Sequence, residues 1–155
     1  HGWATYIDSE TNPATIDITT TDTKLLLDGT SGINTYIPLE IRGIQELWEN
    51  DKIKAVSIGD SYAVRINVTV TAKGGGANVI YFNFDIGGGI TPSLSIGETS
   101  VSILKTAPFT ATAMIHLYSL DTFIANGCQV FMHTDTGTAT ISARNVYIER
   151  SGNSN

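Results

Sequence analysis

One short segment of the 155-residue chain combines side chains that commonly bind sugars. Trp48 stands between Glu46 and Glu49 in the run IQELWEND. An indole ring offers a flat amphipathic surface to a sugar, and carboxylates accept hydrogen bonds from its hydroxyl groups. The segment is therefore a candidate glycan-binding site, although a tryptophan in a core or a subunit contact would give the same pattern. Further aromatic candidates are Trp3, Tyr6 and Tyr36.

Two histidines, His116 and His133, are the candidates for metal binding or pH sensing. Imidazole is a common metal ligand, and its charge changes near pH 6.5. Neither histidine has an acidic partner at a suitable spacing, so a hydrogen-bonded strand histidine is the alternative for both. Carboxylate pairs such as Asp17 with Asp22, or Asp121 with Asp135, lack the spacing of a calcium loop and suit turns better. We predict no metal and no cofactor.

The nucleophilic side chains show no hydrolase pattern. Ser57, Ser61 and Ser119 lie outside any G-x-S-x-G turn. The single cysteine, Cys128, cannot form an internal disulfide, and NGCQVF reads as a small apolar residue at the start of a strand. We therefore predict a protein without enzymatic activity.

The charge and hydropathy of the chain exclude two classes of partner. Nine basic and fifteen acidic residues give a net charge of −6, which disfavours binding to a phosphate backbone. A membrane-spanning helix needs about 18 or more consecutive apolar residues, and the sequence has no such run. We predict neither a nucleic-acid partner nor a membrane partner. The chain begins with His1 instead of methionine, so we expect a fragment or a trimmed chain.

Alternating hydrophobicity predicts an all-β chain. Residues 62–71 alternate strictly, with Tyr62, Val64 and Ile66 on the same face, and residues 79–86 return as a hairpin partner. Residues 109–118 alternate again, with Ala111, Ala113 and Leu117 on the apolar face. About eight to ten strands at spacings of roughly ten residues favour a two-sheet antiparallel sandwich or jelly roll. We expect a single domain over residues 1–150 and a disordered tail over 151–155.

Several local features refine this expectation. The run IQELWEND predicts a strand that ends in the turn ENDK, SVSILKTAPF predicts a strand, and LDTFIANG predicts a loop. No helix is expected. In the last strand the apolar parity changes, which predicts a β-bulge near Arg144 and Asn145.

The closing strands carry apolar side chains on both faces. Neighbouring strand residues point to opposite faces, yet Val130, Phe131 and Met132 are adjacent and all apolar. Several such residues on one sheet would form a patch that a second copy of the protein covers, or that a loop such as LDTFIANG covers instead. The candidate interface residues are Tyr81, Met114, His116, Tyr118, Phe131, Met132 and His133.

Two long segments resemble modules of the tumour necrosis factor-like (complement-head-like) jelly-roll family. The C-terminal run FTATAMIHLYSLDTFIANGCQVFMHTDTGTATISARNVYIER is similar to the closing strands of those modules. The segment GDSYAVRINVTVTA resembles their central G-x-Y-x-V-x-x-x-V strand. The variant most like this chain occurs in bacteriophage virion proteins, as head-decorating, head-fibre or tail-fibre domains. The resemblance implies a homotrimer around a threefold axis.

These observations together predict a non-enzymatic structural protein of a phage virion. The resemblance implies a trimeric jelly roll that decorates a capsid or ends a receptor-binding fibre. Its partners would be two further copies, other capsid or tail proteins and, as an additional ligand, a host-surface glycan. The alternative is a carbohydrate-binding module or lectin that uses Trp48, Glu46 and Glu49.

Overall fold

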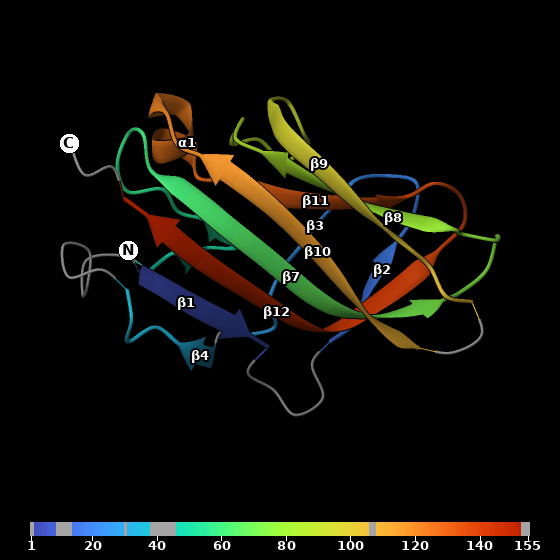
Figure 1. The fold of residues 1–155 in the computed structure, drawn as a ribbon. Coiled ribbons are helices and arrows are strands. Elements are labelled where there is room, and N and C mark those ends of the chain that lie inside the picture. The colour runs from blue at the N-terminus through green and yellow to red at the C-terminus, as the bar shows by residue number, and fades with distance from the viewer. Residues whose placement is uncertain (1, 9–13, 30, 38–45, 106–107, 153–155) are drawn as a thin grey trace.

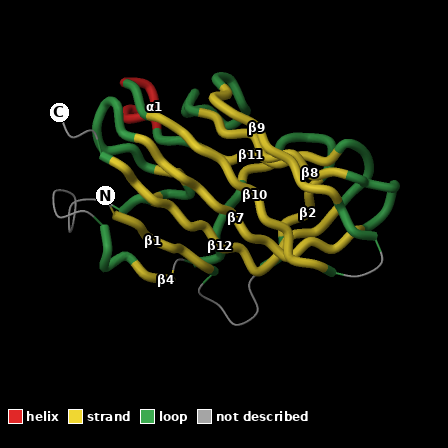
Figure 2. Tube along the Cα trace, in the orientation of Figure 1, coloured by secondary structure: helices red, strands yellow, loops and turns green. Residues whose placement is uncertain are grey.

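A computed structural model of the chain shows two packed antiparallel β-sheets, and it describes residues 2–8, 14–29, 31–37, 46–105 and 108–152. Figure 1 looks onto the larger sheet, with the smaller sheet behind it and above it. Figure 2 shows that strands and loops form nearly all of the described chain, with helix only at one end. The predicted all-β, two-sheet antiparallel sandwich is confirmed.

The larger sheet contains six strands. They are β1 (Gly2–Ile7), β2 (Ile16–Ile18), β4 (Ser31–Ile33), β7 (Ser61–Ala72), β10 (Phe109–Tyr118) and β12 (Ala139–Ser151). Their order is β10-β7-β12-β1-β4, and β2 pairs with the start of β12. The first and last long strands of the chain are therefore neighbours, which brings the start of β1 and the end of β12 to the same end of the molecule (Figure 1).

The smaller sheet contains four strands, in the order β3-β11-β8-β9. They are β3 (Thr23–Lys24), β8 (Val79–Asp85), β9 (Ser95–Ser102) and β11 (Gln129–Thr134). A separate hairpin joins β5 (Trp48–Glu49) to β6 (Lys52–Ile53). Its turn residues Asn50 and Asp51 both have positive φ, as the tight turns of hairpins require, so the predicted turn ENDK is present.

The core lies between the two sheets and follows the predicted alternation. Val64, Ile66 and Val68 of β7 are buried on the inner side of the larger sheet, and Phe82 and Phe84 of β8 are buried opposite them. The partial exposure of the intervening residues of both strands matches the period-two pattern. Burial of each large apolar side chain contributes about 1.5–3 kcal/mol, so the apolar rows that face each other hold the two sheets together.

The described chain has twelve strands against the expected eight to ten, since this count includes β3, β5 and β6, which are only two residues long. Two expectations about individual elements are wrong. The strand expected in SVSILKTAPF begins earlier, since β9 starts at Ser95 and ends at Ser102. The segment LDTFIANG contains a helix, α1 (Asp121–Asn126), instead of a loop.

The helix α1 forms because one of its side chains reaches the core. Phe123 is buried and its ring lies 5.8 Å from the ring of Tyr62. Gly127 has φ of 70° and its N–H donates to the carbonyl oxygen of Phe123, which ends the helix. Six residues are too few to show helical periodicity in the sequence. No helix in the described part of the chain is long and apolar enough to cross a membrane.

The predicted bulge in the last strand is confirmed. The register of β12 against β7 shifts between Ser142 and Asn145. Arg144, inside the bulge, is buried, and its backbone N–H donates to the carboxylate of Asp8 over 2.8 Å. β12 continues through Ser151, one residue into the predicted tail, and residues 153–155 lie outside the described residues.

The bulge provides a stability prediction at Ala143. This exposed alanine has φ of 49°, a conformation that L-residues other than glycine adopt at a cost of about 1–2 kcal/mol. We expect Ala143→Gly to raise the free energy of unfolding by about 0.5–1 kcal/mol, because the relief of this strain exceeds the stability lost to the greater entropy of glycine in the unfolded chain. Urea denaturation measures the change. Ala63→Gly, in the regular part of β7, should lower stability instead, and a loss of stability in Ala143→Gly would contradict the argument.

A buried ion pair fixes one end of the sandwich, where β7 begins and β12 ends. The Nε of Arg150 donates to Asp60 Oδ2 over 2.8 Å, and the two side chains are 5% and 0% exposed. The same oxygen also accepts hydrogen bonds from the Ser57 N–H (3.0 Å) and the Tyr62 hydroxyl (3.2 Å). Burial raises the pKa of Tyr62 to about 12, so its hydroxyl remains a donor at neutral pH.

Candidate functional site

The outer face of the larger sheet carries a line of exposed side chains along β10. Met114 is 64% exposed and Tyr118 is 71% exposed, and His116 lies exposed between them. Strand alternation places all three on the same face, because the residues between them point into the sandwich. We call Met114, His116 and Tyr118 the β10 ridge. Met114 and His116 lie together on an open surface, and Tyr118 is exposed at the end of the same strand.

Aromatic rings gather on the same face, across the sheet from the β10 ridge. Trp3 of β1 stacks on Tyr36 with ring centroids 4.8 Å apart and lies 5.9 Å from the ring of Tyr147 in β12. The guanidinium of Arg65 sits 5.0 Å above the Tyr147 ring. Burial and a 3.0 Å hydrogen bond to Glu149 raise the pKa of the Tyr147 hydroxyl. We call Trp3, Tyr36 and Tyr147 the aromatic cluster.

Small side chains leave a hollow of about 350 Å³ on this face. The register sets Ala63 of β7 between His116 of β10 and Glu149 of β12, and it sets Ser61 between Tyr118 and Ser151. The lining residues are Ser61, Tyr62, Ala63, His116, Glu149 and Ser151. The face therefore has raised apolar side chains at the β10 edge and a depression beside them, a relief suited to packing against another protein surface.

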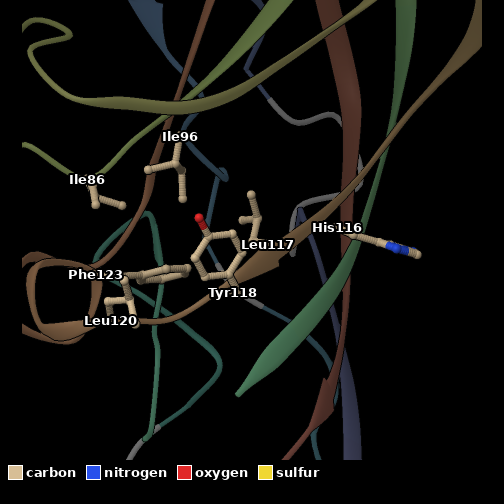
Figure 3. Close-up of a pocket in the computed structure, with 7 residues that line it drawn as sticks. All are labelled: Ile86, Ile96, His116, Leu117, Tyr118, Leu120 and Phe123. Atoms are coloured by element: carbon tan, nitrogen blue, oxygen red, sulfur yellow. The ribbon is translucent and has the colours of Figure 1, made fainter. Parts of the chain in front are cut away.

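A second, apolar pocket of about 120 Å³ opens at the end of β10. It is lined by Ile86, Ile96, His116, Leu117, Tyr118, Leu120 and Phe123. Figure 3 shows the side chains of Ile86, Ile96, Leu120 and Phe123 around the Tyr118 ring, while the imidazole of His116 points away from them. Tyr118 thus belongs both to this pocket and to the β10 ridge.

The remaining predicted interface residues lie elsewhere. Phe131 and Met132 are both buried within one chain, so the prediction that one of them faces outward is wrong. β11 is flanked by β3 and β8, and the register places Phe131 between Lys24 and Asn83. The chain itself therefore covers the second apolar face of this strand.

Tyr81 and His133 lie on the outer face of the smaller sheet. Their rings stack at 4.8 Å, and His133 Nδ1 lies 3.1 Å from Asp22 Oδ1. The prediction that these residues and the β10 residues share one sheet is wrong, because β8 and β11 belong to the other sheet. His133 and His116 therefore lie on the outer faces of different sheets of one chain. Among the described residues no cluster of His, Cys, Asp and Glu could hold a metal ion.

The sugar-binding geometry predicted around Trp48 is also wrong. Trp48 is 2% exposed, so its ring faces the core and cannot stack on a sugar. Glu46 instead accepts hydrogen bonds from the Tyr6 hydroxyl (2.8 Å) and from Asn34 (2.9 Å), while Glu49 is exposed. Trp48 and Glu49 start a hairpin whose alternation sends the two side chains to opposite sides.

Three features of the candidate site were missed by reasoning from the sequence. The parity of β12 after the bulge does place Tyr147 and Glu149 on the outer face, but only the pairing of β1 with β12 brings Trp3 beside them. The hollow depends on the order β10-β7-β12, which no local pattern records. The apolar pocket combines β10, α1 and the loop after β8, so it too depends on the tertiary fold.

The sequence matches no protein-family model, and no curated protein is similar to it. Among solved structures, the chain is similar to the Eiger TNF of S. frugiperda, with a TM-score of 0.57 and 8% identity over 99% of this chain and 94% of that one. It is also similar to the PRD1 vertex protein P5, with a TM-score of 0.55 and 14% identity over 97% of this chain and 73% of that one. At these identities the likeness shows the fold alone, and the fold is the tumour necrosis factor-like jelly roll expected from the closing strands.

Proposed function

We propose that the chain is a non-enzymatic structural protein of a phage virion, and that it acts as a homotrimer at an exposed position on the capsid or on a fibre. The observation that carries the proposal is the open face of the larger sheet, where the β10 ridge and the aromatic cluster remain uncovered in a single chain. TNF-like folds typically form trimers. The similarity to a viral vertex protein supports the virion location.

The arrangement of side chains on the outer face of the larger sheet supports a ring of three subunits. The β10 ridge and the aromatic cluster are different surfaces on the same face of the larger sheet, the ridge at its β10 edge and the cluster on β12 and β1. When one such surface packs against the other surface of the next copy, the contact is heterologous, and a 120° rotation closes it into a trimer. Each square ångström of apolar area buried contributes about 25 cal/mol before the cost of association.

The polar groups of the hollow support a structural role. The hollow holds a serine, a histidine and a glutamate, Ser61, His116 and Glu149, which in other arrangements form a hydrolytic triad. Here the register separates His116 from Glu149 by the whole of β7, and Glu149 accepts the Tyr147 hydroxyl instead. Two strand spacings put the His116 and Glu149 backbones about 10 Å apart, and Glu149 accepts its hydrogen bond from Tyr147 and not from His116.

Two measurements test the proposed function. Light scattering during size-exclusion chromatography should give a mass of three times the 16.6 kDa of one chain. Peptides of the chain should co-purify with intact virus particles through a density gradient, at a stoichiometry that is a multiple of three. A stable monomer would overturn the trimer, and a trimer that separates completely from the particles would overturn the virion location.

A further inference from the structure

The apolar pocket at the end of β10 has the size of one side chain. Its volume is about 120 Å³, and its walls include Ile86, Ile96, Leu120 and Phe123. An apolar cavity of about 150 Å³ holds a molecule the size of benzene, whereas sites for drug-sized ligands occupy about 300–1,000 Å³. The pocket therefore suits a single aliphatic side chain from a partner surface better than a free small molecule.

The same end of the molecule presents an isoleucine of the corresponding size. Ile90 lies in the loop between β8 and β9, and it is 96% exposed, more than any other large apolar side chain in the described chain. Leu94, which ends the same loop, is also exposed, so apolar groups project toward solvent from a short segment beside the pocket. A side chain so exposed gains nothing for the isolated chain, but it can contribute about 1.5–3 kcal/mol if a partner buries it.

The loop that carries Ile90 is held in place by Asp85. The Asp85 carboxylate accepts hydrogen bonds from the backbone N–H groups of Gly87 (2.9 Å), Ser93 (2.7 Å) and Leu94 (2.6 Å). The Asn126 side chain of α1 donates to the Ile86 carbonyl oxygen over 2.9 Å. A Cβ on Gly87 would lie 1.8 Å from Ser93 Oγ, so a larger residue there would force the Ser93 hydroxyl to turn away. A loop ordered before binding loses little entropy when it binds.

We propose that Ile90 of one subunit inserts into the apolar pocket of the neighbouring subunit. Every chain carries both the projecting side chain and the pocket, so a cyclic assembly satisfies all copies with one repeated heterologous contact. The pocket is continuous with the proposed interface, because Tyr118 lines the pocket and also ends the β10 ridge. This inference rests on the proposed trimer and names the contact that closes it at one end.

A designed disulfide tests the contact directly. The double variant Ile90→Cys, Leu120→Cys should form covalent dimers and trimers after mild oxidation, visible on a non-reducing gel. Each single variant should run as a monomer on the same gel. Cys128 does not interfere, because it is fully buried and burial raises the pKa of its thiol. Bridging only within one chain, or no bridging at all, would overturn the proposal.

The strength of the contact is measured with Ile90→Ser. Because Ile90 is exposed in the single chain, this change should leave the subunit fold intact, as circular dichroism would verify. We expect the trimer to dissociate at concentrations at least tenfold higher than for the wild type in sedimentation experiments. Leu104→Ser, at an exposed leucine outside the pocket, is the control and should not alter dissociation.

The outcomes separate the two proposals. A wild-type protein that is monomeric at all concentrations overturns the trimer and the contact together. A trimeric wild type with unchanged dissociation in Ile90→Ser and with no intersubunit disulfide overturns only the contact, and it leaves the proposed function in place.

Discussion

Replacing Asp60 with alanine is expected to lower the free energy of unfolding by about 3–5 kcal/mol. Asp60 is fully buried, and its Oδ2 receives the Arg150 guanidinium at 2.8 Å as well as the Ser57 N–H and the Tyr62 hydroxyl. Removing the carboxylate takes away the acceptor of the buried Arg150 Nε, and it also leaves the Ser57 N–H and the Tyr62 hydroxyl without this acceptor. The loss exceeds the value of the pair itself, because the desolvated guanidinium must then find water or another acceptor.

Urea denaturation at one fixed protein concentration measures the loss, since assembly makes stability depend on concentration. The matched control is Asp17→Ala. Asp17 also pairs with a cation, Lys73, at 3.3 Å, but the two side chains are 58% and 51% exposed. An exposed pair of this kind contributes at most about 1 kcal/mol. Equal losses in the two variants would show that burial is not the cause.

Replacing Met114 with lysine is expected to weaken trimer formation by about 100-fold or more. Met114 lies in the middle of the β10 ridge, 64% exposed in the single chain, so the change should cost the isolated subunit little. In the proposed trimer the ammonium group would be desolvated without a partner, at a cost of several kcal/mol per subunit. Each 1.4 kcal/mol corresponds to a tenfold change in affinity.

Lysine at position 114 tests the interface more stringently than glutamate would, because Arg65 lies opposite this position on β7. The register pairs Met114 with Arg65, so a glutamate at position 114 would gain a salt bridge with that guanidinium, whereas a lysine is repelled by it. Leu26→Lys places the same charge at an exposed leucine just beyond β3, on the side of the smaller sheet, and should leave the trimer intact. Sedimentation velocity over a range of concentrations distinguishes the two variants, and an undisturbed trimer in Met114→Lys would place the interface elsewhere.

The strands that could be predicted are those whose pattern is local. In β7, β8 and β10 one face reads as a regular apolar row at every second residue, and the structure buries or partly buries that face. The bulge in β12 could be predicted for the same reason, because a change of parity is visible along one strand. The helix α1 could not, since a six-residue element shows less than two turns of periodicity and depends on the contact of Phe123 with Tyr62.

The candidate site divides in the same way. The sequence by itself determined that Met114, His116 and Tyr118 belong to one side of a strand whose other side is in the core, because alternation is a property of the extended backbone. Only the tertiary structure decided that Phe131 and Tyr81 belong to the other sheet, that Trp48 is buried, and that Trp3 lies beside Tyr147. Strand order and sheet membership arise from pairing between residues far apart in the chain. The pattern of a short segment therefore does not reveal them.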